Sequence, residues 1–295
     1  MRNTPVAIST RSLVLGMAHQ DGTILASELG PVAQACGQTP EQVRSCLRRL
    51  VEQGLFVRAG SGRKARYDAT EQGLATLGAV VERTRRAYGQ DQAAAGWDGR
   101  WRLVAFAIPE QRRRARDAFR DRLLALGGAA LQGGLYVSPH PWHKDVLAEA
   151  ERLGVADLVS MATTTDLSVG GERDPIQLAR QLWPIDELAR GYQAFCEAFA
   201  EIPSVLEELR RRRQPLPDEA FLPGALAMAV GFAEVFERDP LLPTELLPQP
   251  WLGRAAHALL ATSRRQALAL RQSPDRPVLF RLYDQVIQGV GEDET

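Results

Sequence analysis

One short stretch constrains the fold of this chain most strongly, because it specifies a helix with a defined beginning and end. Thr39 is a good N-cap, Pro40 suits the first helical position, and Gln42 completes a capping box. Apolar residues then recur at the spacing of one helix face, at Val43, Leu47, Leu50 and Val51. Gly54 is typical of a helix end. The sequence therefore predicts a helix over about residues 40–53.

A hairpin with a glycine turn follows this helix. Leu55–Val57 and Ala65–Asp68 have the composition of two short strands, and Gly60–Gly62 supplies the turn between them. Two shorter apolar helices precede the capped helix, at residues 11–19 and 28–35. The order of two helices, a capped helix and a hairpin predicts an N-terminal winged helix-turn-helix, a DNA-binding fold.

The outward positions of the capped helix and of the hairpin are mostly polar or basic. They are Glu41, Gln42, Arg44, Ser45, Arg48 and Arg49 on the helix and Arg58, Arg63, Lys64 and Arg66 on the hairpin. A helix in the major groove reads bases with its N-terminal residues, so we expect Gln42 to pair with adenine and Arg44 with guanine. The hairpin would lie along the phosphate backbone or the minor groove.

Charge is distributed unevenly along the chain. Residues 1–90 carry 12 Lys and Arg against 7 Asp and Glu, whereas the remaining residues carry 24 basic and 29 acidic side chains. A basic end on an acidic body suits a chain that meets phosphate at one end only. Two plainer interpretations stay open, namely a solvated arginine-rich helix face and a winged helix used for protein contacts.

The hydrophobic period changes after a linker of small residues at 90–96. Residues 97–165 alternate short apolar strands and helices in the order βαββαβ, which predicts a ferredoxin-like central domain. From residue 174 to 288 the pattern is helical, with prolines between the later helices. We therefore predict an α+β chain with a winged helix at 1–89, the central domain at 97–165 and a helical C-terminal domain at 174–288.

A small-molecule site is expected where the central and helical domains meet, because ligand sites favour domain interfaces. The candidate residues are Trp183, Tyr192, Phe195, Trp251 and Arg254. Their rings would contact an acyl or aryl group, and the guanidinium would contact an anion. The alternative is that the rings fill hydrophobic cores and that Arg254 forms a salt bridge or lies on the surface.

The sequence does not support catalysis. No nucleophile elbow, phosphate-binding loop or dinucleotide fingerprint is present, and His140 and His143 have no Cys or carboxylate at ligand spacing. We therefore predict no enzyme, no metal site and no cofactor. Three unpaired cysteines, the absence of an apolar run of membrane-spanning length and the absence of a signal peptide predict a cytoplasmic protein.

Three stretches of the chain resemble the PaaX family, the repressors of bacterial phenylacetic-acid degradation operons. They are Arg11–Leu13 with Val43–Gly54, then Trp97–Val104 with Leu126–Gly127 and Leu131–Pro139, and finally Arg238–Pro248 with Trp251–Ala255. The resemblance implies a homodimeric repressor of a catabolic operon that binds double-stranded operator DNA. It also implies release by a small-molecule inducer, usually the acyl-CoA thioester of an aromatic acid.

Two features depart from the patterns that this resemblance implies. The central domain is similar to small CRISPR-associated nucleases, which place a metal-binding Asp where Ala107 stands here. A metal-dependent nuclease, the alternative function, would lack that ligand. The family also tends to have His and basic residues in the helix before Asp239, whereas Ala229–Glu237 is apolar and acidic. An inducer other than phenylacetyl-CoA therefore stays open.

Overall fold

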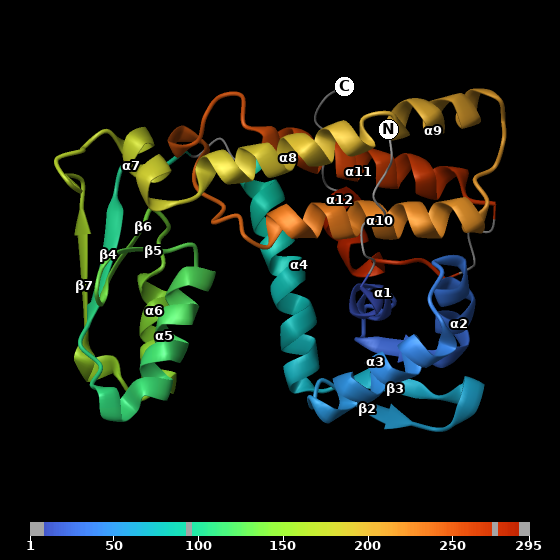
Figure 1. Cartoon of the computed structure of the whole chain (residues 1–295), viewed down its shortest axis with the longest axis horizontal. Helices are drawn as coiled ribbons and strands as arrows, with labels where there is room; N and C mark the ends of the chain where they lie inside the picture. Colours follow the sequence, from blue (N-terminus) through green and yellow to red (C-terminus); the bar gives the residue numbers. More distant parts are fainter. Residues whose placement is uncertain (1–8, 93–95, 273–276, 289–295) are drawn as a thin grey trace. The chain divides into compact units, whose positions relative to one another are not determined.

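The computed structural model describes residues 9–92, 96–272 and 277–288, and its mixed helix and sheet content confirms the predicted α+β class (Figure 1). Contacts divide the chain into two compact units. The first combines the residues up to Gly89 with Tyr192–Glu234 and the residues from Gly253 onward, and the second combines Gln90–Gly191 with Val235–Leu252. The C-terminal third of the chain therefore contributes to both units.

The N-terminal segment of the first unit consists of helices packed around a three-stranded sheet. Its elements, in which η marks a short 3-10 helix, are α1 (Thr10–Gly16), β1 (Thr23–Leu25), α2 (Ala26–Ala35), α3 (Pro40–Glu52), β2 (Phe56–Ala59), η1 (Gly62–Lys64), β3 (Arg66–Ala69) and α4 (Glu71–Gln92). The strands lie in the order β1-β3-β2, and both pairs are antiparallel. Strand β1 was missed in the sequence because three residues are too few to show alternation.

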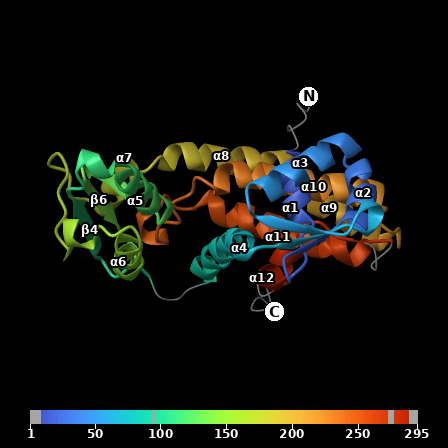
Figure 2. The same ribbon diagram turned by 90° about the horizontal axis from the view of Figure 1, so that it is seen from below.

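One hydrophobic core joins this segment to the C-terminal helices of the same unit, and the ribbons of these helices lie beside α1 and α3 in Figure 2. Leu13 of α1 and Leu50 of α3 are fully buried in it, together with Leu226 of α10 and Leu279. The C-terminal elements are α9 (Ile202–Arg211), α10 (Asp218–Phe236), α11 (Leu252–Leu270), η5 (Arg281–Tyr283) and α12 (Asp284–Gln288). The N-terminal segment is therefore packed firmly against helices that come from the other end of the chain.

Helix α10 corrects one expectation from the sequence. Prolines were expected between the later helices, but Pro223 lies inside α10, because Phe221 and Leu222 are buried in the core and keep the chain helical through it. Among the described residues α10 is the one helix long and apolar enough to cross a membrane by length and composition. Core helices of folded proteins share that composition, and here Phe221, Leu222 and Leu226 pack against α1 and α3 residues.

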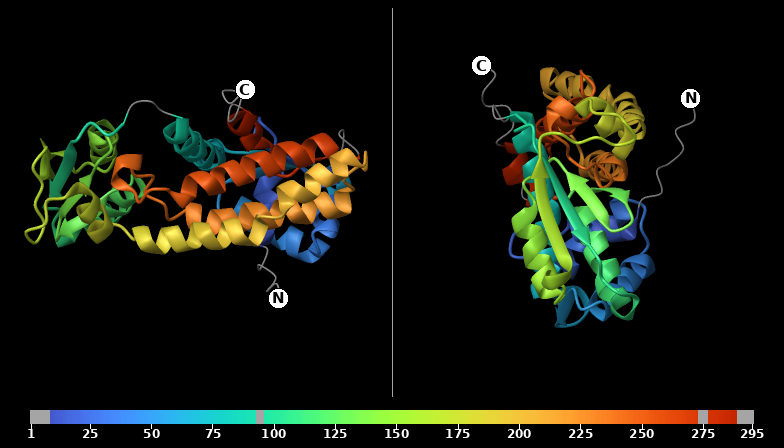
Figure 3. Two further views of the ribbon diagram at one scale, coloured as in Figure 1. Left: turned by 90° about the horizontal axis from the view of Figure 1, so that it is seen from above. Right: turned by 90° about the vertical axis from the view of Figure 1, so that its left-hand side faces the viewer.

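The second unit contains a four-stranded antiparallel sheet with two helices on one of its faces (Figures 1 and 3). Its elements are β4 (Trp101–Phe106), η2 (Glu110–Arg112), α5 (Arg113–Ala125), β5 (Ala129–Gln132), β6 (Leu135–Ser138), α6 (His143–Arg152), η3 (Ala156–Leu158) and β7 (Val159–Thr164). The strands lie in the order β5-β6-β4-β7. Val104, Phe119 and Val146 are fully buried between the sheet and helices α5 and α6.

One element boundary differs from the sequence prediction, and the last strand follows a short 3-10 helix. That strand spans Val159–Thr164, directly after η3. Helix α4 continues through Gln92 into the predicted linker, whose residues 93–95 lie outside the described residues. The remaining elements are α7 (Pro175–Leu182), α8 (Ile185–Phe199) and η4 (Thr244–Leu246).

The segment around Asp239–Leu241, part of the third stretch that carries the family resemblance, belongs to the second unit. His140 Nε2 forms a hydrogen bond with the carbonyl oxygen of Pro240 (3.0 Å), and Gln90 Nε2 donates to the carbonyl oxygen of Leu241 (2.8 Å). Asp239 is buried and accepts a hydrogen bond from the Leu241 backbone N–H (2.7 Å). These bonds hold the segment between α10 and α11 within the second unit.

Candidate nucleic-acid interface

Helix α3 begins at a capping box, as the sequence predicted. Thr39 Oγ1 accepts from the backbone N–H of Gln42 (3.2 Å), and Gln42 Oε1 accepts from the backbone N–H of Thr39 (2.7 Å). Pro40 occupies the first turn, where its missing N–H costs no intrahelical hydrogen bond. These contacts fix the start of the helix, which is the end that would enter a groove of DNA.

The two faces of α3 are sharply different. The buried face consists of Val43, Cys46, Leu47 and Leu50. Val51 was predicted on this face but is only half-buried, and Cys46 is buried in addition. The opposite face bears the predicted DNA-contacting residues. Glu41, Gln42, Arg44, Arg48 and Arg49 are exposed, and Ser45 is half-buried.

Each arginine on α3 has a contact within the helix. Arg44 Nη2 lies 2.6 Å from Glu41 Oε2, Arg48 Nε lies 3.9 Å from Glu52 Oε1, and Arg49 Nε donates to the carbonyl oxygen of Ser45 (3.4 Å). Hydrogen bonding to Arg44 holds the pKa of Glu41 below its ordinary value, so this carboxylate stays ionised at neutral pH. Exposed pairs of this kind contribute little stability, so a phosphate or a base can replace the carboxylates readily.

The capping box changes what Gln42 can do. Its amide oxygen already accepts the backbone hydrogen bond of Thr39. A bidentate contact to adenine uses both the oxygen and the nitrogen of the amide. Since an amide oxygen has two lone pairs, the predicted contact would share this oxygen between the cap and the base, whereas the Nε2 group can donate to a base without involving the cap. Sequence reasoning found both roles for Gln42 but not the competition between them.

The hairpin formed by β2 and β3 bears a second group of exposed basic side chains. Arg58, Arg63 and Lys64 are exposed, and none forms an ion pair with another described residue. Arg66 differs from them, because its Nε lies 2.5 Å from Asp68 Oδ1. Gly60 at the turn has φ near +74°, and a Cβ there would lie 3.1 Å from the backbone oxygen of Lys64. The turn therefore favours glycine, as the hairpin prediction requires.

The five effector candidates do not form one cluster within either unit. Tyr192 is fully buried in the first unit and packs near Phe232 and His257, and Phe195 packs against Phe199 and Phe232. Each of these two rings therefore serves a hydrophobic core.

The other three effector candidates are divided between the units. Trp183 is buried in the second unit, where it stacks on Trp101 and donates through Nε1 to the carbonyl oxygen of Gly127 (3.2 Å). Trp251 is also buried in that unit, and Arg254 in the first unit is exposed. The effector site at these residues stays a prediction.

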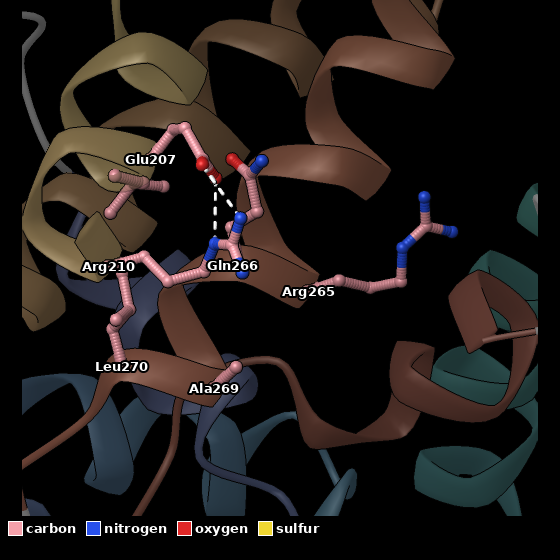
Figure 4. A pocket seen from close by; sticks show the side chains of 7 residues that line it. Glu207, Arg210, Arg265, Gln266, Ala269 and Leu270 are labelled. Carbon is pink, nitrogen blue, oxygen red and sulfur yellow. Dashed lines mark hydrogen bonds and ion pairs between the residues drawn. The ribbon is translucent and has the colours of Figure 1, made fainter. Parts of the chain in front are cut away.

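A pocket that the sequence did not indicate lies between α9 and α11 of the first unit (Figure 4). Its volume is about 310 Å³, and it is lined by Leu206, Glu207, Arg210, Arg265, Gln266, Ala269 and Leu270. No periodic signal marks such a pocket, because its residues lie on two helices that meet only in the folded chain.

In the part of the chain that the structure describes, no three His, Cys, Asp or Glu side chains lie close enough together to hold a metal ion. Ala107 follows directly after β4 and is exposed. His143, the other histidine of the weak motif, is partly buried, and burial lowers the pKa of its imidazole below the ordinary value.

Comparisons with known proteins agree with the resemblance seen in the sequence. A family model described as the PaaX protein central Cas2-like domain matches residues 94–178, and one described as the PaaX-like protein C-terminal domain matches residues 183–273. Together they span more than half of the chain. The transcriptional repressor PaaX of Escherichia coli (strain K12) is 28% identical over 264 residues, which are 86% of this chain and 79% of that protein.

A solved structure shares the fold. The uncharacterized protein Rv0674 from Mycobacterium tuberculosis aligns with a TM-score of 0.52 and 22% identity, over 90% of this chain and 99% of that one. The curated relative is a regulator and not an enzyme, which confirms the prediction that this chain is no enzyme. By its two domain matches and its similarity over most of its length, the chain belongs to the PaaX family of transcriptional repressors.

Proposed function

We propose that this chain is a transcriptional repressor that binds double-stranded operator DNA through a winged helix-turn-helix formed by its N-terminal segment. The observation that carries the proposal is one segment that presents both a capped helix with an exposed arginine face and a hairpin with three cations that form no ion pair with a residue the structure describes. An exposed helix of this kind can contact bases in the major groove, and a basic hairpin can bind the phosphate backbone. The repressor named among the relatives supports the same assignment.

In this proposal α3 enters the major groove and the β2–β3 hairpin contacts phosphates beside it. Arg44 leaves Glu41 and donates two hydrogen bonds to a guanine, while Gln42 donates through Nε2 with its cap intact. Arg48 and Arg49 lie one turn further along and contact phosphate. The fourth basic residue of the hairpin, Arg66, pairs with Asp68 and would have to leave that carboxylate to contact a phosphate.

The other segments suit a regulator assembled as a homodimer in the cytoplasm. The strand order of the second unit suits the ferredoxin-like βαββαβ fold, and the matching family model is described as Cas2-like. Two copies would place two α3 helices in successive major grooves, about 34 Å apart along the DNA. The operator would then be an inverted repeat. The remaining helices would form the predicted C-terminal domain.

The inducer that we propose is a small molecule that lowers the affinity for the operator, with an aromatic acyl-CoA as the class implied by the family resemblance. The site would include Trp183, Tyr192, Phe195, Trp251 and Arg254. Since four of these five side chains are buried, binding there requires the surrounding helices to separate. An alanine variant of Arg254, the exposed member, should weaken the inducer without changing the affinity for the operator.

A direct test measures binding to DNA upstream of the gene for this chain. Fluorescence anisotropy with a labelled duplex and with a shuffled duplex of the same composition should show preference for the native sequence and strong dependence on salt. Equal affinity for both duplexes at every salt concentration would overturn the proposal of sequence-specific binding. A protein-interaction role for the winged helix predicts that outcome.

A further inference from the structure

We propose that the pocket between α9 and α11 is a regulatory ligand site for a small amphipathic carboxylate, an acid with an apolar body of aryl or alkyl character. This inference rests on the proposed repressor function, and it adds a site distinct from the five effector candidates named above. The pocket lies wholly within the first unit, the unit that also contains the candidate DNA-binding segment.

The walls of the pocket are suited to an apolar body. Leu206 of α9 is buried, and Ala269 and Leu270 of α11 complete the apolar surface (Figure 4). A volume of about 310 Å³ is near the lower end of the range for small-molecule sites. It therefore favours a free acid over the corresponding CoA thioester, whose nucleotide portion would have to remain outside.

A polar atom in the wall lacks a partner among the residues that the structure describes. The amide oxygen of Gln266 is buried and accepts no hydrogen bond from any of them. A buried acceptor without a donor destabilises a protein, which is why such atoms are rare and often mark a binding site. Rotation of the amide would present its NH₂ group instead, so Gln266 can donate to one oxygen of a carboxylate.

The charges around the pocket favour an anion. The lining contains two arginines, Arg210 and Arg265, and one carboxylate, Glu207. Arg210 donates to both oxygens of Glu207 from Nε and Nη2, each at 2.8 Å, within one exposed turn of α9. Such a surface pair is weak and can exchange partners. Figure 4 shows Arg265 extending away from Arg210 and Gln266, so Arg210 is the guanidinium that a ligand carboxylate would meet. The carboxylate would replace Glu207 on Arg210, which can bind it with two hydrogen bonds.

The wall formed by α11 is connected directly to the candidate DNA-binding segment. At its end, the buried Arg271 forms an ion pair with Asp218 (3.0 Å) and donates to the carbonyl oxygen of Pro277 (3.4 Å). Earlier in α11, Arg264 donates to the carbonyl oxygen of Leu279 (2.9 Å). The position of residues 277–279 therefore depends on α11.

The same residues lead into the N-terminal segment. Leu279 is fully buried in the core with α1 and α3 residues, and Phe280 donates its backbone N–H to the carbonyl oxygen of Gly16 in α1 (2.5 Å). Arg281 forms an ion pair with Glu28 of α2 (3.0 Å). A ligand that favours one arrangement of α9 against α11 would thus change the support of α1 and α2, on which α3 packs.

Isothermal titration calorimetry on the full chain tests the site without DNA. The probes are 3-phenylpropionate and octanoate, each compared with its neutral amide and with its CoA thioester. We expect both acids to bind in the millimolar range or better, the amides to bind at least about tenfold more weakly because they lack the charge, and the thioesters to bind no better than the acids.

Matched variants locate the binding. Arg210→Gln and Gln266→Leu should each weaken the acids about tenfold. Arg211→Gln is the control, because Arg211 forms the same type of exposed pair with Glu208 one residue further along α9 and does not line the pocket. Leu206→Trp, which fills the cavity, should abolish binding. Circular dichroism would verify that this variant is folded.

The outcomes separate this site from the DNA-binding proposal. Binding of the acids that is lost in Arg210→Gln and kept in Arg211→Gln supports the site whether or not the chain binds operator DNA. Failure of both acids to bind, or binding that is equal in Arg210→Gln, Gln266→Leu and wild type, overturns it. In the presence of saturating acid, the operator affinity should change in wild type and stay constant in Arg210→Gln.

Discussion

Helices α3 and α5 are both rich in arginine, yet they differ in how their charges are arranged. On α5, Arg113, Arg116 and Arg120 each lie within 4.0 Å of a carboxylate from Glu110, Asp117 or Asp121. On α3, Arg44 pairs with Glu41 and Arg48 with Glu52, and a hairpin follows whose Arg58, Arg63 and Lys64 pair with no described residue. A count of charges alone would rank the two regions as similar.

The comparison teaches that the arrangement of a basic surface decides its use more than its composition does. Asp117 lies within 3.9 Å of Arg113, Arg116 and Arg120, and this network reduces the field of that side of the helix outside the protein. In the N-terminal segment, the anions are few, and the hairpin cations, which pair with none of the residues that the structure covers, stand beside a capped helix. Phosphates can therefore gain charge-assisted hydrogen bonds there without displacing a carboxylate.

The largest expected effects come from the buried faces of the same two helices. Leu50→Ala in α3 and Phe119→Ala in α5 remove fully buried side chains and should each cost about 2–5 kcal/mol of the free energy of unfolding. Leu50→Ala should also abolish operator binding, because it loosens α3. Phe119→Ala should leave it within about twofold at temperatures where the first unit is folded. Thermal unfolding and anisotropy measure both effects. If Phe119→Ala lost operator binding while Leu50→Ala kept it, the assignment of DNA binding to α3 rather than α5 would be wrong.

A smaller effect is expected at the exposed start of α3. Arg44→Ala should cost about 1–3 kcal/mol of binding free energy on the native operator and relax the preference at one base pair. Anisotropy against a set of duplexes, each with one substituted base pair, measures this preference. Arg114→Ala on α5 is the matched control, since this exposed arginine also stands on a helix. An unchanged base preference in Arg44→Ala would show that Arg44 does not contact a base.

The smallest effect, of the opposite sign, is expected from removing the carboxylate that holds Arg44. Glu41→Gln should raise the affinity for any duplex a few-fold, because it removes a negative charge from the groove-facing side and releases the guanidinium. The pKa of Glu41 lies below its ordinary value, so the wild-type carboxylate becomes neutral, like the Gln side chain of the variant, only in acid. The gain should therefore be constant around neutral pH. A gain that varies there, or a loss, would contradict this role of Glu41.

The parts of the fold that local chemistry determines were predictable. The capping box of Thr39 and Gln42 was read from residue types three apart, and it sets the start of α3 in the structure. The glycine turn of the hairpin was likewise visible, because the left-handed φ of Gly60 is a local property of the backbone. The exposed positions of the arginines followed from the apolar period on the other side of the helix.

The parts that tertiary packing determines were not predictable. Strand β1 exists because Thr23–Leu25 pairs with β3, and its three residues carry no pattern of their own. Helix α10 continues through Pro223 because buried neighbours hold it. The pairing of the α5 arginines, the occupied amide oxygen of Gln42 and the pocket between α9 and α11 all depend on rotamers and on contacts between elements.

The measurement that tests the central claim most directly is the salt dependence of operator binding. The logarithm of the association constant should fall linearly with the logarithm of salt concentration in wild type. In the variant with Arg58, Arg63 and Lys64 all replaced by Ala, the slope should become shallower by about 2.7, because three phosphate contacts are lost. The matched variant with Arg113, Arg114 and Arg120 of α5 replaced by Ala should keep the wild-type slope. A wild-type slope in the hairpin variant, or an equally shallow slope in both variants, would contradict the assignment of the N-terminal hairpin as the phosphate-binding element.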